Sequence, residues 1–73
     1  MSKLKRDIGE RFGTLRCERS YRAFAKDTKI SESLLQRYET GGGLPSTENL
    51  VALVKSEKVN LHWLLLGKGS MLL

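Results

Sequence analysis

Four polar residues near the middle of the chain have a spacing that would place them on one face of a helix. They stand at i, i+3, i+4 and i+7, and are Ser33, Gln36, Arg37 and Thr40. Side chains of these types can hydrogen-bond base edges: the Gln36 amide suits adenine, and the Arg37 guanidinium can fork to guanine or hold a phosphate. Alternatively, they are ordinary solvated positions on a surface helix.

Glu32 and Leu34 lie beside these positions, and each allows two interpretations. Glu32 could accept a hydrogen bond from cytosine, although its charge repels phosphates, or it could simply favour the start of a helix through the macrodipole. Leu34 could touch a thymine methyl group, or it could contact Tyr38 one helical turn later.

Helix-start and helix-stop residues predict five helices that could position this face. The expected ranges are 3–18, 21–27, 32–40, 47–54 and 61–66, and the expected N-caps are Ser20, Ser31, Ser46 and Asn60. Residues 28–30 would form a turn, 41–43 a glycine stop and 55–59 a polar connection, and Gly67 would end the last helix. Strand signals are absent, so the sequence predicts an all-α fold.

One apolar face on each helix would build a single core. Helical periodicity predicts burial of Leu4, Ile8, Phe12, Leu15, Phe24, Ala25, Leu35, Tyr38, Leu50, Val51, Leu53 and Val54. Gly9 and Gly13 interrupt the first helix, which either weakens it by roughly 1 kcal/mol each or marks close packing.

The composition indicates one small basic domain. Its 73 residues have 13 Lys and Arg against 8 Asp and Glu, a net charge of +5. This balance favours a polyanionic partner, either nucleic acid or a membrane surface. One cysteine, Cys17, excludes an internal disulfide, and with His62 as the one histidine no metal or other cofactor is expected. Apolar runs such as 63–66 are far too short to cross a bilayer, and the charged start is unlike a signal peptide.

Several motifs occur together in a distinctive order: Ala25, Ile30-Ser31, RYETG at 37–41, Pro45-Ser46 before ENL at 48–50, and NLHWLLLGKG at 60–69. This series resembles the repressor/Cro family of phage and bacterial helix-turn-helix regulators, and residues 19–31 are especially like those of prophage repressors. The resemblance covers about residues 8–69. It implies a compact five-helix, lambda-repressor-like DNA-binding domain over 1–69, followed by a short apolar tail at 70–73.

The resemblance also implies roles for individual residues. Base contacts would come from Glu32, Ser33, Gln36 and Arg37, and phosphate contacts from Ser20, Tyr21, Arg22, Thr40 and Gly43. An ion pair would join Arg16 to Glu39. A dimer interface would use Trp63, Leu65, Leu66 and Met71.

Four positions depart from the family pattern. Lys29 stands where the turn usually has glycine, Thr28 replaces a usual leucine, and the positions after Gly41, often basic in relatives, are Gly42 and Gly43. A phosphate contact in that loop would then use backbone amides. The cations that could compensate are Lys3, Lys5, Arg6, Arg19 and Lys26.

The expected function is sequence-specific binding of double-stranded DNA by a homodimeric phage-type repressor in the host cytoplasm or nucleoid. The third helix would enter the major groove of a pseudo-palindromic operator, and bound protein would occlude a promoter. The basic second helix, with Arg22 and Lys26, favours repression over activation by analogy with the family. The alternative is a protein-interaction module such as an antitoxin, whose partner would bind the last helix or the tail. No residues support an enzyme, a membrane partner or a small-molecule substrate.

Overall fold

Short polar side chains begin all five helices of the computed structural model, which describes residues 2–73. The helices are α1 (Lys3–Arg16), α2 (Tyr21–Thr28), α3 (Glu32–Glu39), α4 (Thr47–Glu57) and α5 (Leu61–Leu66). The predicted N-caps Ser20, Ser31, Ser46 and Asn60 each accept a hydrogen bond from a backbone amide, and Ser2 does the same for α1. The all-α prediction is confirmed, because no strand occurs among the described residues.

Four helix ends differ from the prediction, two of them by one residue only, since α2 ends at Thr28 and α3 at Glu39. The helix α1 stops at Arg16, two residues earlier than expected at Glu18, because Cys17 takes a backbone φ of 59° and ψ of −126°. The helix α4 continues through Glu57, so the prediction of a polar connection over 55–59 is wrong. Glu57 is held at this end by an ion pair to Arg19, with Arg19 Nη2 2.6 Å from Glu57 Oε1.

The turn between α2 and α3 accommodates both of its unusual residues. Lys29 is left-handed, with a φ of 66°, as its replacement of a glycine implies. Thr28 is buried, and its hydroxyl donates to the Phe24 carbonyl oxygen at 2.8 Å and accepts from the Ile30 amide at 3.3 Å. A threonine can therefore replace an apolar residue there without leaving a buried polar atom unpaired.

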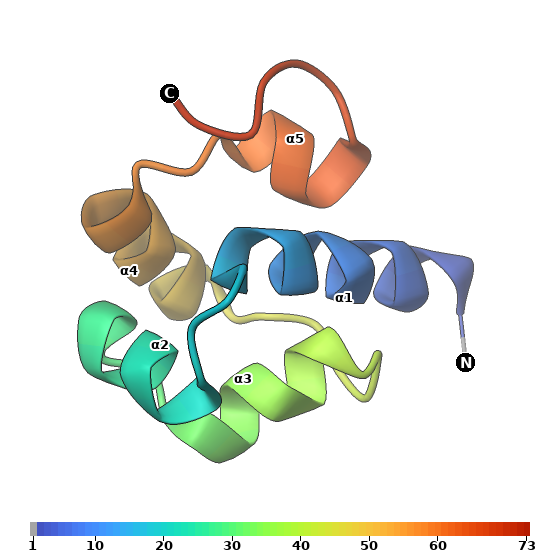
Figure 1. Cartoon of the computed structure of the whole chain (residues 1–73). Helices are drawn as coiled ribbons and strands as arrows, with labels where there is room; N and C mark the ends of the chain where they lie inside the picture. The colour runs from blue at the N-terminus through green and yellow to red at the C-terminus, as the bar shows by residue number, and fades with distance from the viewer. Residues whose placement is uncertain (1) are drawn as a thin grey trace.

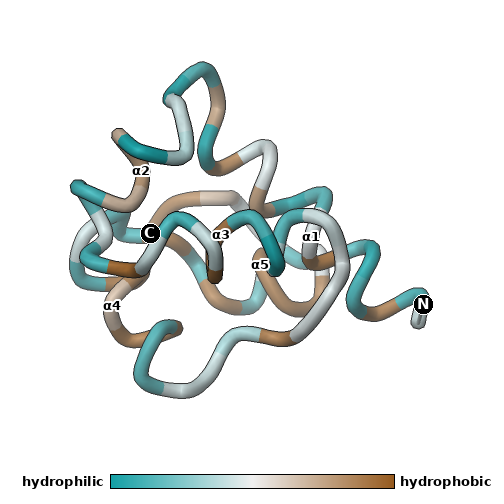
Figure 2. The backbone as a smooth tube through the Cα atoms, turned by 90° about the horizontal axis from the view of Figure 1, so that it is seen from below, coloured by the Kyte–Doolittle hydropathy of each residue, from teal (hydrophilic) through white to brown (hydrophobic). Residues whose placement is uncertain are grey.

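The helix α1 crosses the middle of the molecule and separates α3 from α5 (Figure 1). It packs against both of them, while α2 packs against α3 and α4. Figure 2 shows hydrophobic and hydrophilic stretches alternating along the backbone, as helices with one buried face require. The core consists of Ile8, Phe12, Leu15, Phe24, Ile30, Leu35, Tyr38, Leu53, Val59 and Leu64.

Three residues of the predicted pattern are placed differently. Leu4 is 50% exposed, because it lies in the first turn of α1, beyond the reach of the other helices. Val51 is 46% exposed on the outer side of α4, whereas Leu53 is completely buried on the inner side. Val59, expected in a polar connection, is completely buried.

The C-terminal residues return to the domain and hydrogen-bond to the segment between α4 and α5. The Asn60 amide donates to the Met71 carbonyl oxygen at 2.8 Å, and the Leu73 amide donates to that of Lys58 at 2.7 Å. Val59 and Leu72 form an isolated antiparallel bridge. Residues 70–73 are thus attached to the base of α5 by backbone hydrogen bonds.

Candidate nucleic-acid interface

The outer side of α3 is open to solvent along its whole length. Every polar residue proposed for base contact on this helix is exposed, namely Glu32, Ser33, Gln36 and Arg37. Leu34 is 38% exposed at the side of the same face. The structure therefore brings the predicted base-contacting side chains together on one accessible surface.

The inner side of α3 is anchored by Leu35 and Tyr38, as predicted. Both are buried, and the Tyr38 ring lies 5.5 Å from that of Phe12 between centroids. The Tyr38 hydroxyl accepts a hydrogen bond from the Asn49 side-chain amide of α4 at 2.8 Å. One aromatic residue thus joins α3 to α1 by packing and to α4 by a directional bond.

Gly9 allows α1 and α3 to approach closely. A Cβ atom at this position would lie 2.5 Å from the Glu39 carbonyl oxygen and 2.9 Å from that of Tyr38. These are backbone atoms, so they cannot yield without moving the end of α3. Of the two explanations for a glycine inside α1, close packing is confirmed at Gly9.

Arg16 and Glu39 form a bidentate ion pair between α1 and α3. Arg16 Nε and Nη2 each donate to a Glu39 carboxylate oxygen at 2.8 Å. Arg16 Nη1 also donates to the Arg19 carbonyl oxygen at 2.7 Å, and its Cζ lies 4.4 Å from the centre of the Tyr21 ring. The hydrogen bond to Glu39 raises the pKa of Arg16, so the guanidinium remains charged. One side chain therefore links α1, the α1–α2 connection, α2 and α3.

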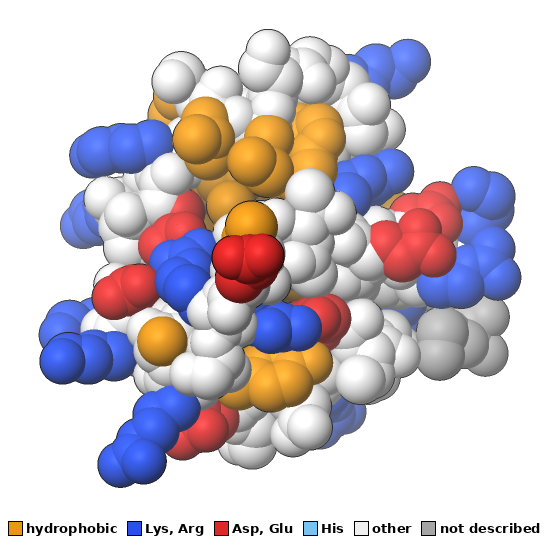
Figure 3. Space-filling model, in the orientation of Figure 1, with side chains coloured by type: hydrophobic (Ala, Val, Ile, Leu, Met, Phe, Trp, Pro, Cys, Tyr) orange, Lys and Arg blue, Asp and Glu red, His pale blue; other side chains and the backbone are white. Residues whose placement is uncertain are grey.

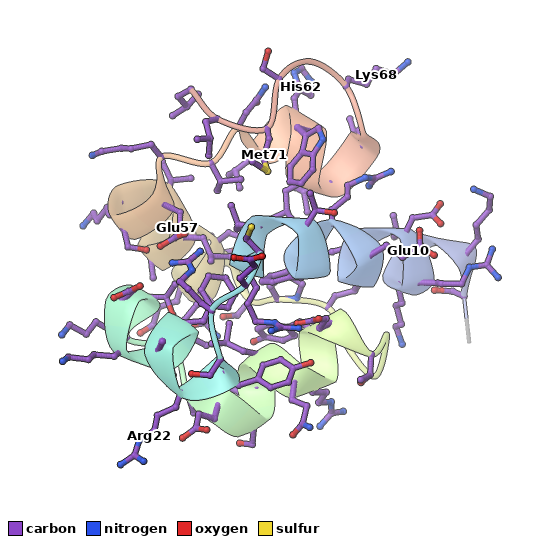
Figure 4. The ribbon with its side chains drawn as sticks, viewed as in Figure 1. Glu10, Arg22, Glu57, His62, Lys68 and Met71 are labelled. Atoms are coloured by element: carbon purple, nitrogen blue, oxygen red, sulfur yellow. The ribbon has the colours of Figure 1, made fainter. Side chains whose placement is uncertain are left out.

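The first turn of α2 holds three of the residues proposed for phosphate contact. Ser20 is exposed, although its hydroxyl oxygen already accepts from the Ala23 amide at 3.0 Å. Tyr21 is half-buried, and burial raises the pKa of its phenol, which keeps it a neutral hydrogen-bond donor. Arg22 extends away from the body of the molecule (Figure 4). These groups give the helix start an exposed cation and a neutral hydrogen-bond donor, an arrangement that suits a phosphate.

The remaining proposed phosphate contacts lie at the other end of α3. The Thr40 hydroxyl donates to the Gln36 carbonyl oxygen at 2.9 Å, and Thr40 is exposed. Gly43 is half-exposed, and the Arg37 side chain lies against it. Arg37 Nε donates to the Gly42 carbonyl oxygen at 3.2 Å. The Arg37 guanidinium is thus turned toward the loop, away from Ser33.

Two of the five cations that could compensate for the glycine loop have partners within the fold. Lys3 Nζ lies 2.8 Å from Asp7 Oδ2. Arg19 donates to Asp27 and Glu57, and its Cζ lies 4.5 Å from the centre of the Phe24 ring. Arg19 is therefore a structural residue that ties the α1–α2 connection to α2 and α4. Nothing in the sequence distinguishes this structural role from phosphate binding, because an arginine next to a helix start is compatible with both.

The residues proposed for a dimer interface lie on and beside α5. Trp63, Leu65 and Met71 are half-buried and pack partly against the core, whereas Leu66 is 58% exposed. Leu72 and Leu73 are also exposed, and hydrophobic atoms gather over this end of the molecule (Figure 3). His62 and Cys17 are exposed.

The part of the chain that the structure describes has neither a candidate metal site nor a candidate membrane span. No three His, Cys, Asp or Glu side chains within residues 2–73 gather where they could hold a metal ion. No helix in that same range has both the length and the apolar character needed to span a bilayer.

Comparison with known protein families adds a match over most of the chain. The model of a family described as Helix-turn-helix matches residues 14–64. This stretch runs from the last turn of α1 into α5 and contains all of α2, α3 and α4. No curated protein and no solved structure matches the chain.

Proposed function

The chain belongs to the helix-turn-helix family, and from this premise we propose that it is a phage-type repressor that reads a pseudo-palindromic operator through α3. The family is one of DNA-binding transcription regulators, and phage repressor/Cro-like proteins are found in it. Repression would follow from occlusion, because bound protein and polymerase compete for the same duplex.

The observation that carries the proposal is the two-sided character of α3. Its inner side is fixed by Leu35, Tyr38 and the Arg16–Glu39 pair, while Ser33 and Gln36 face solvent. An α-helix with its side chains is about 10–12 Å in diameter and so fits the major groove, which is about 12 Å wide. Fixed orientation and exposed hydrogen-bonding groups are the two properties that base reading requires.

Phosphate contacts would flank the reading helix on both sides. The start of α2 offers Tyr21 and Arg22, and the end of α3 offers Thr40 and the backbone of Gly43. Such contacts would set the position of α3 on the duplex and provide much of the affinity.

A homodimer would use the apolar surface of α5, with Trp63, Leu65, Leu66 and Met71 in the interface. The exposed Leu66, Leu72 and Leu73 support an apolar partner at this end. Figure 1 shows α3 and α5 on opposite sides of α1. The second copy must therefore contact α5 from the side, and not from the end that points away from α3, if both α3 helices are to face one duplex. Each domain measures 28 × 27 × 24 Å. The distance between the α3 helices of two copies placed side by side would therefore be comparable with the ~34 Å that separates half-sites one DNA turn apart.

Selection of bound duplexes from a random pool tests the proposal. The wild-type protein should enrich one short palindrome, and its affinity for that duplex should fall steeply with salt. The Ser33→Ala/Gln36→Ala variant should lose about tenfold or more of its preference for the selected duplex over random duplex, since each base pair read is worth about 1–3 kcal/mol. A matched Ser56→Ala/Ser70→Ala variant removes two exposed hydroxyls elsewhere and should keep the preference.

Three results would contradict the proposal. Full preference in the Ser33→Ala/Gln36→Ala variant would remove α3 as the reader. A monomer in sedimentation at tens of micromolar, with and without the selected duplex, would remove the dimer. If this chain binds DNA weakly and without salt dependence, and forms a tight complex with a different protein, these two observations together would favour the antitoxin alternative.

A further inference from the structure

We propose that Gly42 and Gly43 form a seat for Arg37: because they lack Cβ atoms, they leave space for its side chain to lie against the loop after α3. The guanidinium is thereby held at the edge of the DNA major groove, where it binds a phosphate. The inference rests on the proposed function, because it concerns the same surface. It assigns Arg37 to affinity and positioning, and leaves base reading to the residues earlier in α3.

The first observation is the direction of the Arg37 side chain. Its Nε donates to the Gly42 carbonyl oxygen at 3.2 Å, which fixes the stem over the loop that follows α3. That bond uses the Nε hydrogen alone, so both terminal nitrogens keep their donors. Arg37 is exposed, and a forked pair of N–H donors matches the oxygens of a phosphate.

The second observation explains why two glycines follow Gly41. Gly41 has a φ of 80° and needs the conformational freedom of glycine, whereas Gly42 and Gly43 do not have positive φ. A Cβ atom at Gly42 would lie 3.1 Å from Arg37 Cγ, and one at Gly43 would lie 3.0 Å from Arg37 Nε. The backbone therefore tolerates a side chain at both positions, and the seated arginine is what a side chain would displace.

The third observation favours a phosphate over a base. Recognition helices contact base edges mainly with their N-terminal residues, and Arg37 lies in the last turn of α3. The loop toward which it turns lies where the helix leaves the groove, beside the DNA backbone. Residues 38–54 contain no Lys or Arg. Arg37 is thus a cation at this end of α3 whose side chain is fixed over the loop.

The test compares Arg37→Ala and the Gly42→Ala/Gly43→Ala variant with wild type on two duplexes, the selected palindrome and a random sequence. Both variants should weaken binding to both duplexes by about tenfold, since a hydrogen bond between charged groups is lost. The slope of log affinity against log salt should fall by about 1 for each protomer bound. Thermal melts should show that both variants fold, because the atoms that must yield belong to one flexible side chain.

Lys68→Ala is the matched control. It also removes one positive charge, but Lys68 lies at the α5 end of the molecule, away from α3 (Figure 4). The Lys68→Ala variant should keep the salt slope of wild type. Arg37→Lys should keep part of the affinity, since it retains the charge and loses the fork.

Three results would overturn the inference. If Arg37→Ala loses preference at one base pair while the salt slope is unchanged, Arg37 reads a base. If the double alanine variant binds as wild type does, the glycines do not seat Arg37. If the wild-type protein binds no duplex, the proposed function fails first, and that result differs from the other two because wild type itself is inactive.

Discussion

The α3 end and the α5 end of the molecule are held by different kinds of interaction. Around α3, the Arg16–Glu39 pair and the Asn49–Tyr38 hydrogen bond act in fixed directions, and Gly9 sets the approach of α1. Around α5, buried Leu64 packs into the core and its carbonyl oxygen accepts from Arg11 Nη1 at 3.1 Å, while Leu66 remains exposed. Backbone hydrogen bonds attach the C-terminal residues at this end. The directional bonds at α3 join pairs of side chains, whereas those at α5 end on backbone oxygens. The difference teaches that paired polar side chains gather where a helix must be aimed.

The largest effect should come from truncating one buried leucine at each end. Leu35→Ala and Leu64→Ala should each cost about 3 kcal/mol of unfolding free energy, because both side chains are essentially fully buried. Under conditions where both variants are folded, Leu35→Ala alone should weaken preference for the selected duplex. Urea denaturation and a binding titration would check this. Equal loss of preference in both variants would break the comparison.

A methyl group at the α1–α3 contact should have the next largest effect. Gly9→Ala should destabilise the fold by about 2 kcal/mol, because its Cβ would overlap the backbone of Glu39. Gly13→Ala is the comparison: its Cβ would lie 3.1 Å from Glu39 Oε1, which accepts from Arg16 Nη2. A shift of a few tenths of an ångström in that side chain should cost less than moving backbone, and the better helix propensity of alanine should offset part of the cost. Similar melting temperatures for the two variants would argue against the close approach.

Loss of the Arg16–Glu39 ion pair should affect the orientation of α3, and thus DNA binding, in addition to the stability of the fold. Arg16→Ala should cost about 1.5 kcal/mol, since charge-assisted hydrogen bonds are removed, and should weaken DNA binding. Hydrogen bonding to Glu39 raises the pKa of Arg16 in the folded protein. A base whose pKa is raised on folding stabilises the folded state, and that stabilisation is lost only as the pH rises through the pKa of the folded protein. The difference between Arg16→Ala and wild type should therefore stay constant between about pH 7 and pH 9. Unchanged melting and unchanged affinity would remove this role.

The smallest effect should be a gain in stability at the end of α1. Cys17 has a φ of 59° and a ψ of −126°, a conformation that favours glycine. Cys17→Gly should raise the free energy of unfolding by about 1 kcal/mol without changing DNA binding. Calorimetry measures the gain, and a lower melting temperature would show that the thiol contributes more than the strain costs.

Much of the fold follows from local signals in the sequence. Serine and asparagine caps predicted the starts of α2 to α5 because capping is a contact within one turn. Periodicity predicted Leu35 and Tyr38 as the buried side of α3, and thus the exposed side. These features depend on neighbours within a few residues, which the sequence shows directly.

The rest depends on contacts between distant residues. Cys17 ends α1 without a stop signal of its own, and α4 runs past Val54 to Glu57, which pairs with Arg19. The burial of Val59 and the seating of Arg37 over the glycine loop likewise need the three-dimensional arrangement. The roles of the individual DNA-contacting residues stay predictions.

The hydrogen bond from Asn49 to Tyr38 has a consequence for specificity. Successive residues on a helix are about 100° apart, so a roll of that size about the axis of α3 would bring a different set of side chains, such as Leu34, to the front. Tyr38 cannot follow such a roll while its hydroxyl is tethered to α4 at 2.8 Å. An amide in α4 that is absent from the proposed contact surface thereby restricts which side chains α3 presents to solvent, and under the proposed function which of them would meet the bases.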